Sequence, residues 1–331
     1  MLNSSKVPAA MVVRLVGGFA IAGALVMSPD EARANDYPNR TVTIVVPFAP
    51  GGPNDVLARV LAEQLSGDWG VNVIVDNRPG GGTVIGSQAV AASAADGYTL
   101  LMASTSTASN VTLRQLPYDT QAAFVPVVLM GTAPTALAVH PDLPIESVSD
   151  LIAYAQANPG TTLAGTGGVG SSTDLKSHLL VQEAGIDSTV IPYEGGGPAR
   201  TDLIGGRLTW AFLNLLSAVP DIEAGLIRAI GVTGAEESPS MPGVPPISDT
   251  IPDFEAYNWW GMFAPAGTPE DVVAQINAAV NAVVEREEMV TFMSNLGTTP
   301  VTMSAEDFAQ FFESQVTLWA GVIERAGIAE Q

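Results

Sequence analysis

The sequence contains no cysteine, only two lysines and only two histidines in 331 residues. The lack of cysteine excludes disulfide bonds, thiolate metal ligands and cysteine nucleophiles. His140 and His178 stand far apart, there is no G-x-S-x-G motif, and the carboxylates are dispersed. We therefore expect no metal, no cofactor and no catalytic residues.

Positive charge is scarce, with 13 Lys and Arg against 34 Asp and Glu and a formal net charge of −21. A surface of this kind repels nucleic acid and anionic lipid, so neither is expected as a partner. It also repels an anionic ligand at long range. Any anion site must therefore be built locally.

Residues 1–34 have the pattern of a secretory signal. Lys6 and Arg14 are positive, Leu15 to Met27 is apolar but short for a membrane span, and a small-x-small site ends at Ala34. No later stretch is apolar for long enough to cross a membrane. We expect cleavage after about Ala34, a mature chain that does not insert into the membrane, and a periplasmic location.

A Gly- and Pro-rich turn, 47–55, separates an apolar run, Val42–Val46, from a segment with helical spacing. Asn54 or Asp55 is expected to cap this helix. The free N–H groups and the positive dipole end of a helix start can hold an anion. The alternative is an ordinary strand-to-helix turn whose glycines only permit the bend.

Three other Gly-rich runs, at 77–82, 165–173 and 193–198, follow β-rich segments. A run of four hydroxyl residues, at 104–107, follows a further β-rich segment. In a parallel sheet such loops collect at the carboxyl ends of the strands, where open α/β sheets bind ligands. We expect the Gly-rich loops to share one small-molecule cleft. The hydroxyl groups at 104–107 either contact the ligand or only cap the next turn.

Alternation of strand and helix patterns predicts parallel α/β sheets in two blocks. Strands are expected near 42–46, 71–75, 99–103, 124–130, 136–139, 162–164, 190–193, 210–213, 227–233 and 259–264. Helices are expected near 54–66, 83–92, 148–157, 172–183, 199–205, 269–285 and 305–326, the last as one helix or two, with a loop at 236–252. The predicted fold is a two-lobe α/β body crossed twice by the chain, with its ligand cleft between the lobes.

Residues 35–130 plus 257–331 would form the first lobe and 131–256 the second. Gly131 to Pro134 is a candidate hinge, and closure is expected about this segment and Tyr257. Of the adjacent Trp259 and Trp260, one should fill the core and one should line the cleft.

Gly165, Gly167 and Gly170 form a G-x-G-x-x-G pattern, and Glu194 follows the next strand. This pattern is typical of dinucleotide binding. It keeps open a second hypothesis, a nucleotide-using α/β enzyme. The expected export signal and the lack of residues suited to hydride chemistry weigh against it.

Several ordered motifs resemble the receptor component of tripartite tricarboxylate transporters, the Bug receptor family. They are Tyr37-Pro-Asn-Arg40, Pro47-Phe-Ala-Pro-Gly-Gly52 with Asp55, Asn77-Arg-Pro-Gly80, Asp96-Gly-Tyr-Thr-Leu100, Leu116-Pro-Tyr-Asp119, Pro192-Tyr-Glu-Gly-Gly-Gly-Pro-Ala199 and Ala264-Pro-Ala-Gly-Thr-Pro269. Each motif is weak alone. Their order, which extends from about Tyr37 to Ile328, is specific.

The resemblance implies a periplasmic receptor of the type II binding-protein fold that closes on a small carboxylate and delivers it to a membrane permease. The ligand would be a dicarboxylate, a tricarboxylate or an aromatic acid, held by main-chain N–H groups without a buried Lys or Arg, on a receptor expected to be monomeric. The residues expected to contact it are Phe48, Ala49, Pro50, Gly51, Gly52, Asp55, Ser104, Thr105, Gly167, Gly168, Ser171, Ser172, Thr173, Gly195, Gly196, Gly197, Asn214 and Trp259.

The chain departs from the family pattern at two places. Many members carry a His where this chain has Asp174 or its neighbour, and many carry Asp-Asn where it has Leu213-Asn214. The second departure makes an amino-acid ligand less expected and the far end of the pocket more apolar. An exported sensor with the same fold stays open as an alternative to a transport receptor, and permease genes beside this one would favour transport.

Overall fold

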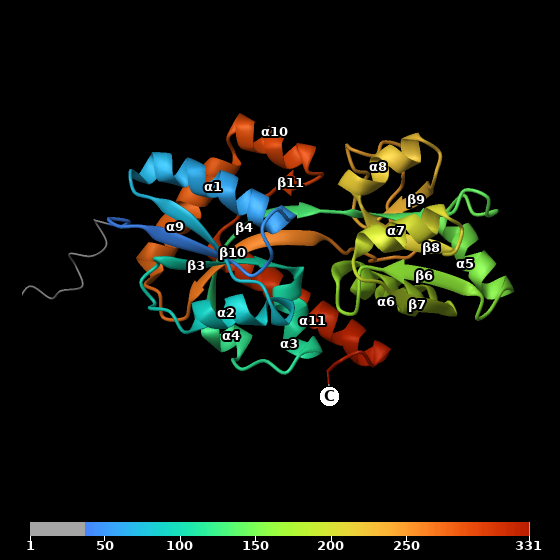
Figure 1. Ribbon diagram of the computed structural model, residues 1–331, viewed down its shortest axis with the longest axis horizontal. Coiled ribbons are helices and arrows are strands. Elements are labelled where there is room, and N and C mark those ends of the chain that lie inside the picture. Colours follow the sequence, from blue (N-terminus) through green and yellow to red (C-terminus); the bar gives the residue numbers. More distant parts are fainter. Residues whose placement is uncertain (1–36, 331) are drawn as a thin grey trace, which may run out of the picture. The chain divides into compact units, whose positions relative to one another are not determined.

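Two β-sheets, each flanked by helices, make up residues 37–330, the part of the chain that the structure describes (Figure 1). The structure is a computed structural model. The expected signal segment, 1–34, lies outside the described residues. Among residues 37–330, every helix is too short or too polar to cross a membrane.

The first sheet is mixed and has the strand order β11-β4-β10-β3-β1-β2. Its strands are β1 (Val42–Val46), β2 (Val73–Asn77), β3 (Thr99–Ser104), β4 (Phe124–Ala133), β10 (Asn258–Pro265) and β11 (Thr299–Pro300). β1 is parallel to β2 and β3, whereas β10 is antiparallel to β3 and β4. The parallel pairing expected for the first three strands is confirmed, and the returning strand β10 adds antiparallel pairing between β3 and β4.

Alternation along β1 sends successive side chains to opposite faces of the first sheet. Ile44 and Val46 pack with one helix pair and Val45 with the other helices. One face carries α1 (Pro53–Trp69) and α9 (Glu270–Val284), and the other carries α2 (Val84–Ala91), α3 (Thr105–Leu113), α4 (Thr120–Ala123) and α11 (Ala305–Ala326) (Figure 1). α10 (Glu287–Asn295) follows α9 and precedes β11.

The second sheet has the order β7-β6-β8-β5-β9. Its strands are β5 (Thr135–Val139), β6 (Thr162–Thr166), β7 (Ser188–Pro192), β8 (Trp210–Asn214) and β9 (Arg228–Val232). Its helices are α5 (Val148–Ala157), α6 (Ser172–Ala184), α7 (Gly196–Ile204) and α8 (Leu215–Glu223). β6 is parallel to β7 and β8, and β5 is antiparallel to β8 and β9.

The chain passes from the first sheet to the second at Pro134, between β4 and β5, and returns just before Asn258. Most of the candidate hinge is strand. Gly131 pairs with Trp260 and Pro300, and a Cβ there would lie 2.9 Å from the carbonyl oxygen of Thr299. The expected division into lobes at residue 131 stays a prediction, and the first sheet itself extends to Ala133.

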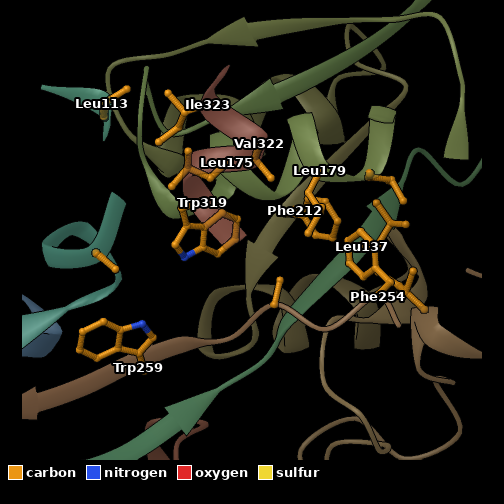
Figure 2. Packing of buried hydrophobic residues seen from close by; sticks show 14 of the residues in the cluster. Leu113, Leu137, Leu175, Leu179, Phe212, Phe254, Trp259, Trp319, Val322 and Ile323 are labelled. Atoms are coloured by element: carbon orange, nitrogen blue, oxygen red, sulfur yellow. The ribbon is translucent and has the colours of Figure 1, made fainter. Parts of the chain in front are cut away.

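Helix α11 is one helix of 22 residues and contacts both α3 and α6. Phe308, Phe311 and Phe312 surround the indole of Trp259 at ring-centroid distances of about 6 Å. Further along, Trp319, Val322 and Ile323 belong to the same buried cluster as Leu175 and Leu179 of α6 (Figure 2). The C-terminal helix therefore packs against elements of both sheets.

Four helices, α3, α4, α8 and α10, and the short strand β11 are not predicted by the sequence, and β2 begins two residues later than expected. α8 starts directly after β8 with no intervening loop, and α10 follows α9 after a break at Glu285 and Arg286. Neither start carries a Gly or Pro turn signal. The expected loop 236–252 holds one short 3₁₀ turn, Ile247–Asp249.

Gly261 of β10 leaves no room for a side chain. A Cβ there would lie 2.4 Å from Cζ of Phe308 and 2.9 Å from the carbonyl oxygen of Val128. We expect Gly261→Ala to lower the free energy of unfolding by about 1–3 kcal/mol, measured by urea denaturation. Gly321→Ala on α11, where the added Cβ meets no atom within 4 Å, is the control and should be neutral or stabilising by up to about 1 kcal/mol. Equal stability of Gly261→Ala and the wild type would contradict this packing.

Candidate functional site

A cavity of about 550 Å³ lies among residues of both sheets and the C-terminal region. This volume is within the range of small-molecule sites. The described residues that line it include no Lys, Arg, His, Asp or Glu. They are Phe48, Pro53, Asn54, Leu57, Ser104, Thr105, Ser106, Ala133, Pro134, Ser171, Ser172, Asn214, Leu215, Leu216, Ser217, Asn258, Trp259, Trp260, Met293, Leu296, Gly297 and Thr298.

Four helices begin at this cavity. Its lining includes the first residues or the N-caps of α1, α3, α6 and α8. These are Pro53 and Asn54 for α1, Ser104 to Ser106 for α3, Ser171 and Ser172 for α6, and Asn214 to Ser217 for α8. Helix starts present unpaired N–H groups and the positive end of the helix dipole. The cavity is therefore suited to an anion although no positively charged side chain lines it.

The strand order explains why these four helices meet. β2 lies on one side of β1 and β3 on the other, and β7 and β8 flank β6 in the same way. The chain thus reverses direction across the sheet between β1 and β3, and again between β6 and β8. In α/β sheets, ligands bind at the carboxyl ends of the strands on either side of such a reversal. α1 and α3 follow the first pair of strands, and α6 and α8 follow the second.

The first loop is braced by its own side chains. α1 begins at Pro53 with Gly52 as N-cap and no side-chain cap, so the expectation that Asn54 or Asp55 caps it is wrong. The Asp55 carboxylate accepts a hydrogen bond from Gly51 N–H at 2.8 Å and pairs with Arg59. The hydrogen bond from Arg59 is the main reason that the pKa of Asp55 falls to about 2. Asp55 is therefore buried and ionised beside the loop and does not line the cavity.

The loop between β6 and α6 is closed in the same way. Thr173 Oγ1 accepts from Gly167 N–H at 2.9 Å, and the Asp174 carboxylate accepts from Gly170 N–H at 2.9 Å and from the Thr166 hydroxyl at 3.0 Å. A Cβ at Gly165 would lie 2.3 Å from Leu208. Packing accounts for this glycine of the G-x-G-x-x-G pattern, and the carboxylate inside the loop disfavours a phosphate.

Both interpretations of the hydroxyl run after β3 are compatible with the structure. Ser104 and Thr107 form a capping box at the start of α3. Ser104, Thr105 and Ser106 also line the cavity. The hydroxyl of Thr105 is buried and has no hydrogen-bond partner among the described residues.

Three lining residues carry a buried polar atom that is unpartnered within residues 37–330. These atoms are the side-chain oxygen of Asn54, the Thr105 hydroxyl and the indole nitrogen of Trp259. Buried polar groups are normally satisfied, and leaving one unpaired costs about 1–3 kcal/mol. Of these groups, the Thr105 hydroxyl is a donor at the start of α3, whereas the indole of Trp259 is packed among phenylalanines.

The cavity brings together only part of the expected contact set. Those that line it are Phe48, Ser104, Thr105, Ser171, Ser172, Asn214 and Trp259. Those that do not are Ala49, Pro50, Gly51, Gly52, Asp55, Gly167, Gly168, Thr173, Gly195, Gly196 and Gly197. Their contact with a ligand stays a prediction.

Two of the four Gly-rich loops are absent from the lining, so a cleft shared by all four stays a prediction. The loops at 77–82 and 193–198 follow β2 and β7, which are the edge strands of their sheets. The four helices that begin at the cavity follow strands inside the sheets, namely β1, β3, β6 and β8. The side chain of Trp259 is fully buried among phenylalanines, and Trp260, partly exposed, lines the cavity beside it.

The largest omission of the sequence reasoning is Lys176. Its side chain is fully buried on α6, and its Nζ donates to Asn258 Oδ1 at 2.8 Å. Burial lowers the pKa of Lys176 from 10.5 to about 7. Lys176 does not line the cavity, so the expectation that the ligand is held without a buried Lys or Arg stays a prediction. The helical spacing places position 176 beside Leu175 and Leu179, but a pattern does not reveal that a lysine occupies a core position.

Comparison with known proteins agrees with this geometry. Residues 57–328 match the family model described as "Tripartite tricarboxylate transporter family receptor". The chain belongs to this receptor family. A Rhodopseudomonas palustris protein solved with adipate is 34% identical, with a TM-score of 0.75, over 89% of this chain and 99% of the other.

Two further solved structures are similar to this receptor. MatC from Rhodopseudomonas palustris, with bound malate, is 30% identical with a TM-score of 0.72 over 87% of this chain and 100% of the other. The periplasmic binding protein BugD is 31% identical with a TM-score of 0.72 over 89% and 100%. The predicted family and the two-lobe α/β binding-protein fold are confirmed. This receptor is a member of a family of periplasmic solute-binding proteins.

The buried lysine of this receptor makes stability depend on pH. Between pH 7 and pH 10.5 the unfolded chain holds a proton on Lys176 that the folded chain does not, so stability should rise with pH in this window. We expect the wild type to gain about 2–3 kcal/mol of unfolding free energy relative to Lys176→Met between pH 7 and pH 9.5, measured by urea denaturation. Leu179→Met, a buried change on the same helix, should keep the wild-type slope. Parallel curves for the wild type and Lys176→Met would show that the lysine does not titrate in this range.

Proposed function

We propose that this receptor captures a small organic carboxylate in the cavity between its two sheets and delivers it to the permease of a tripartite tricarboxylate transporter. The observation that carries the proposal is the meeting of four helix starts at a cavity lined by no charged side chain. Main-chain N–H groups and hydroxyls bind a carboxylate well when water is excluded. These uncharged groups can bind a carboxylate even in a protein whose overall negative charge repels anions.

The remaining lining supports an organic acid over an inorganic anion. Phe48, Leu57, Trp260, Met293 and Leu296 supply apolar surface beside the polar helix starts. A molecule with a carboxylate and an apolar body fits both kinds of lining. Relatives solved with adipate and malate support the same ligand class. The choice among dicarboxylates, tricarboxylates and aromatic acids stays open.

The proposal includes cleavage after about Ala34, which rests on the signal pattern of residues 1–34. It also includes periplasmic export, a monomeric state and delivery to a permease. The two chain crossings, at Pro134 and just before Asn258, lie at the cavity. Closure about these segments would bring the starts of α1 and α3 toward those of α6 and α8. Exclusion of water would then strengthen each N–H to carboxylate bond.

A thermal-shift screen tests the proposal with succinate, malate, adipate, citrate and benzoate, and with NAD as a control for the nucleotide hypothesis. A ligand that binds only the folded receptor raises its melting temperature by mass action. We expect at least one carboxylate to stabilise the receptor and NAD to have no effect. Stabilisation by NAD alone would favour the enzyme hypothesis.

The Thr105 hydroxyl provides a sharper test. Thr105→Val keeps the shape of the side chain and removes a donor at the cavity, and a hydrogen bond to a charged group is worth about 1.5–3 kcal/mol. We expect the affinity for the best carboxylate to fall roughly tenfold to a hundredfold, measured by calorimetry.

Thr120→Val is the matched control for this test. Thr120 is also the first residue of a helix, is equally buried at 4% exposure, and has an unpartnered hydroxyl, but it does not line the cavity. Its replacement should leave the affinity unchanged within about twofold, because no ligand atom is lost. Equal losses for both variants would count against the cavity as the binding site.

A further inference from the structure

Lys176 is a fully buried lysine without a carboxylate partner. It is one of two lysines in the sequence and the only one in the described part of the chain. None of the ion pairs among residues 37–330 includes it, and Asn258 is its one hydrogen-bond partner there. A buried ammonium group that lacks an opposite charge is costly. A structural role alone would be served by a neutral side chain.

The hydrogen bonds of Lys176 lead to the cavity in two steps. Nζ donates to Asn258 Oδ1 at 2.8 Å, and Asn258 Nδ2 donates to Asn214 Oδ1 at 3.0 Å. Both asparagines line the cavity, and Asn214 is the N-cap residue of α8. We call these three residues the amide relay.

The ammonium group determines the direction of the relay because it can only donate. It holds the oxygen of Asn258 toward itself, which turns the Asn258 amide nitrogen toward Asn214. The Asn214 oxygen is then occupied, and its Nδ2 is left as a donor that no hydrogen bond in the described part of the chain uses. Two polarised amides thus connect a buried positive charge to an N–H donor beside the cavity.

We propose that Lys176, acting through Asn258 and Asn214, is a specificity determinant that makes this receptor prefer a dicarboxylate to a monocarboxylate of the same length. The inference rests on the proposed function and extends it. One carboxylate would be held at the helix starts, and the second would be held by Asn214 Nδ2. Lys176 is a positioning residue here because it acts on the ligand through the two amides.

Binding and the charge of the lysine are coupled in this arrangement. A second carboxylate near the relay stabilises the ammonium form, so the ligand raises the proton affinity of Lys176 and the charged lysine raises the affinity for the ligand. Burial keeps the pKa of Lys176 at about 7 without the ligand. Dicarboxylate binding above this pH is therefore accompanied by proton uptake.

The other charged groups near α6 are hydrogen-bonded within their own loop, ion-paired or exposed, and the packed strands contain none. On α6 itself, Asp174 accepts two hydrogen bonds from its own loop and lies 3.9 Å from His178, and Glu183 pairs with Arg325 of α11. The strands packed against α6, which are β6, β7 and β8, contain no titratable residue, and neither does β10. The other titratable residues of α11 are Glu306, Asp307, Glu313 and Glu324, all exposed.

The test compares two ligand pairs of matched chain length, adipate with hexanoate and succinate with butyrate, by isothermal titration calorimetry. Lys176→Gln keeps an N–H donor for Asn258 and removes the charge. We expect the wild type to bind the dicarboxylate of at least one pair more tightly. We expect Lys176→Gln to weaken dicarboxylate binding at least tenfold and to change monocarboxylate binding less than threefold.

Proton uptake provides a readout that a merely structural role would not affect. Titrations at pH 7.5 in two buffers of different ionisation enthalpy should show uptake when the wild type binds the dicarboxylate. Uptake should be absent with the monocarboxylate and with Lys176→Gln. Leu179→Met, a core change on the same helix, controls for altered packing and should behave as the wild type.

Asn214→Ala keeps the inference testable if Lys176→Gln does not fold, because Asn214 is exposed. It should lose the dicarboxylate preference in the same way. Binding of both members of a pair with equal affinity, or an unchanged preference in Lys176→Gln or Asn214→Ala, overturns the inference and leaves the proposed function intact. A wild type that binds none of the four acids also overturns the inference, and the thermal-shift screen with citrate and benzoate then decides separately whether the proposed function holds.

Discussion

The pairing of two parallel strands in each sheet, β1 with β3 and β6 with β8, is the constraint on which the site depends. Each strand of a pair is followed by a helix, and the chain reverses across the sheet between them. The four helix starts therefore point out of the carboxyl ends of their strands into one cavity. The loops are held in shape by their own side chains, with Asp55 bonded to Gly51 and Thr173 bonded to Gly167. The binding surface is thus formed by main-chain N–H groups, and the sheet topology determines where these groups point.

This use of the main chain suits the charge of the protein. Each arginine between residues 37 and 330 already has a carboxylate or carbonyl partner, in Arg40–Asp96, Arg59–Asp55, Arg78–Asp76, Arg114–Glu330, Arg200–Asp221, Arg207–Asp202, Arg286–Asp68, Arg325–Glu183 and Arg228 with two carbonyl oxygens. None of them lines the cavity. Positive potential at the site comes from helix dipoles and, in our proposal, from the one buried lysine.

Helix α11 and the crossings connect this site to the rest of the fold. Its aromatic residues surround Trp259, which follows Asn258 of the relay, and its distal half packs against α6, which carries Lys176 (Figure 2). A shift between the two sheets would therefore move the relay as well as the helix starts. The same few side chains would therefore respond to the charge of the ligand, to protonation of Lys176 and to movement of one sheet against the other.

The sequence alone determined most elements, because hydrophobic periodicity and turn residues are local signals, and its ordered motifs indicated the family by resemblance. β1, α5 and the long α11 lie where their patterns place them. Local signals also led to the loops before α1 and α6, where the cavity lies. They do not encode strand order, so only the tertiary structure decided that β10 is antiparallel, that the loops after the edge strands β2 and β7 stay outside the cavity, and that the start of α8 joins it. They also could not reveal that the single lysine of the described chain is buried beside Asn258, because its surroundings come from residues far away in the sequence.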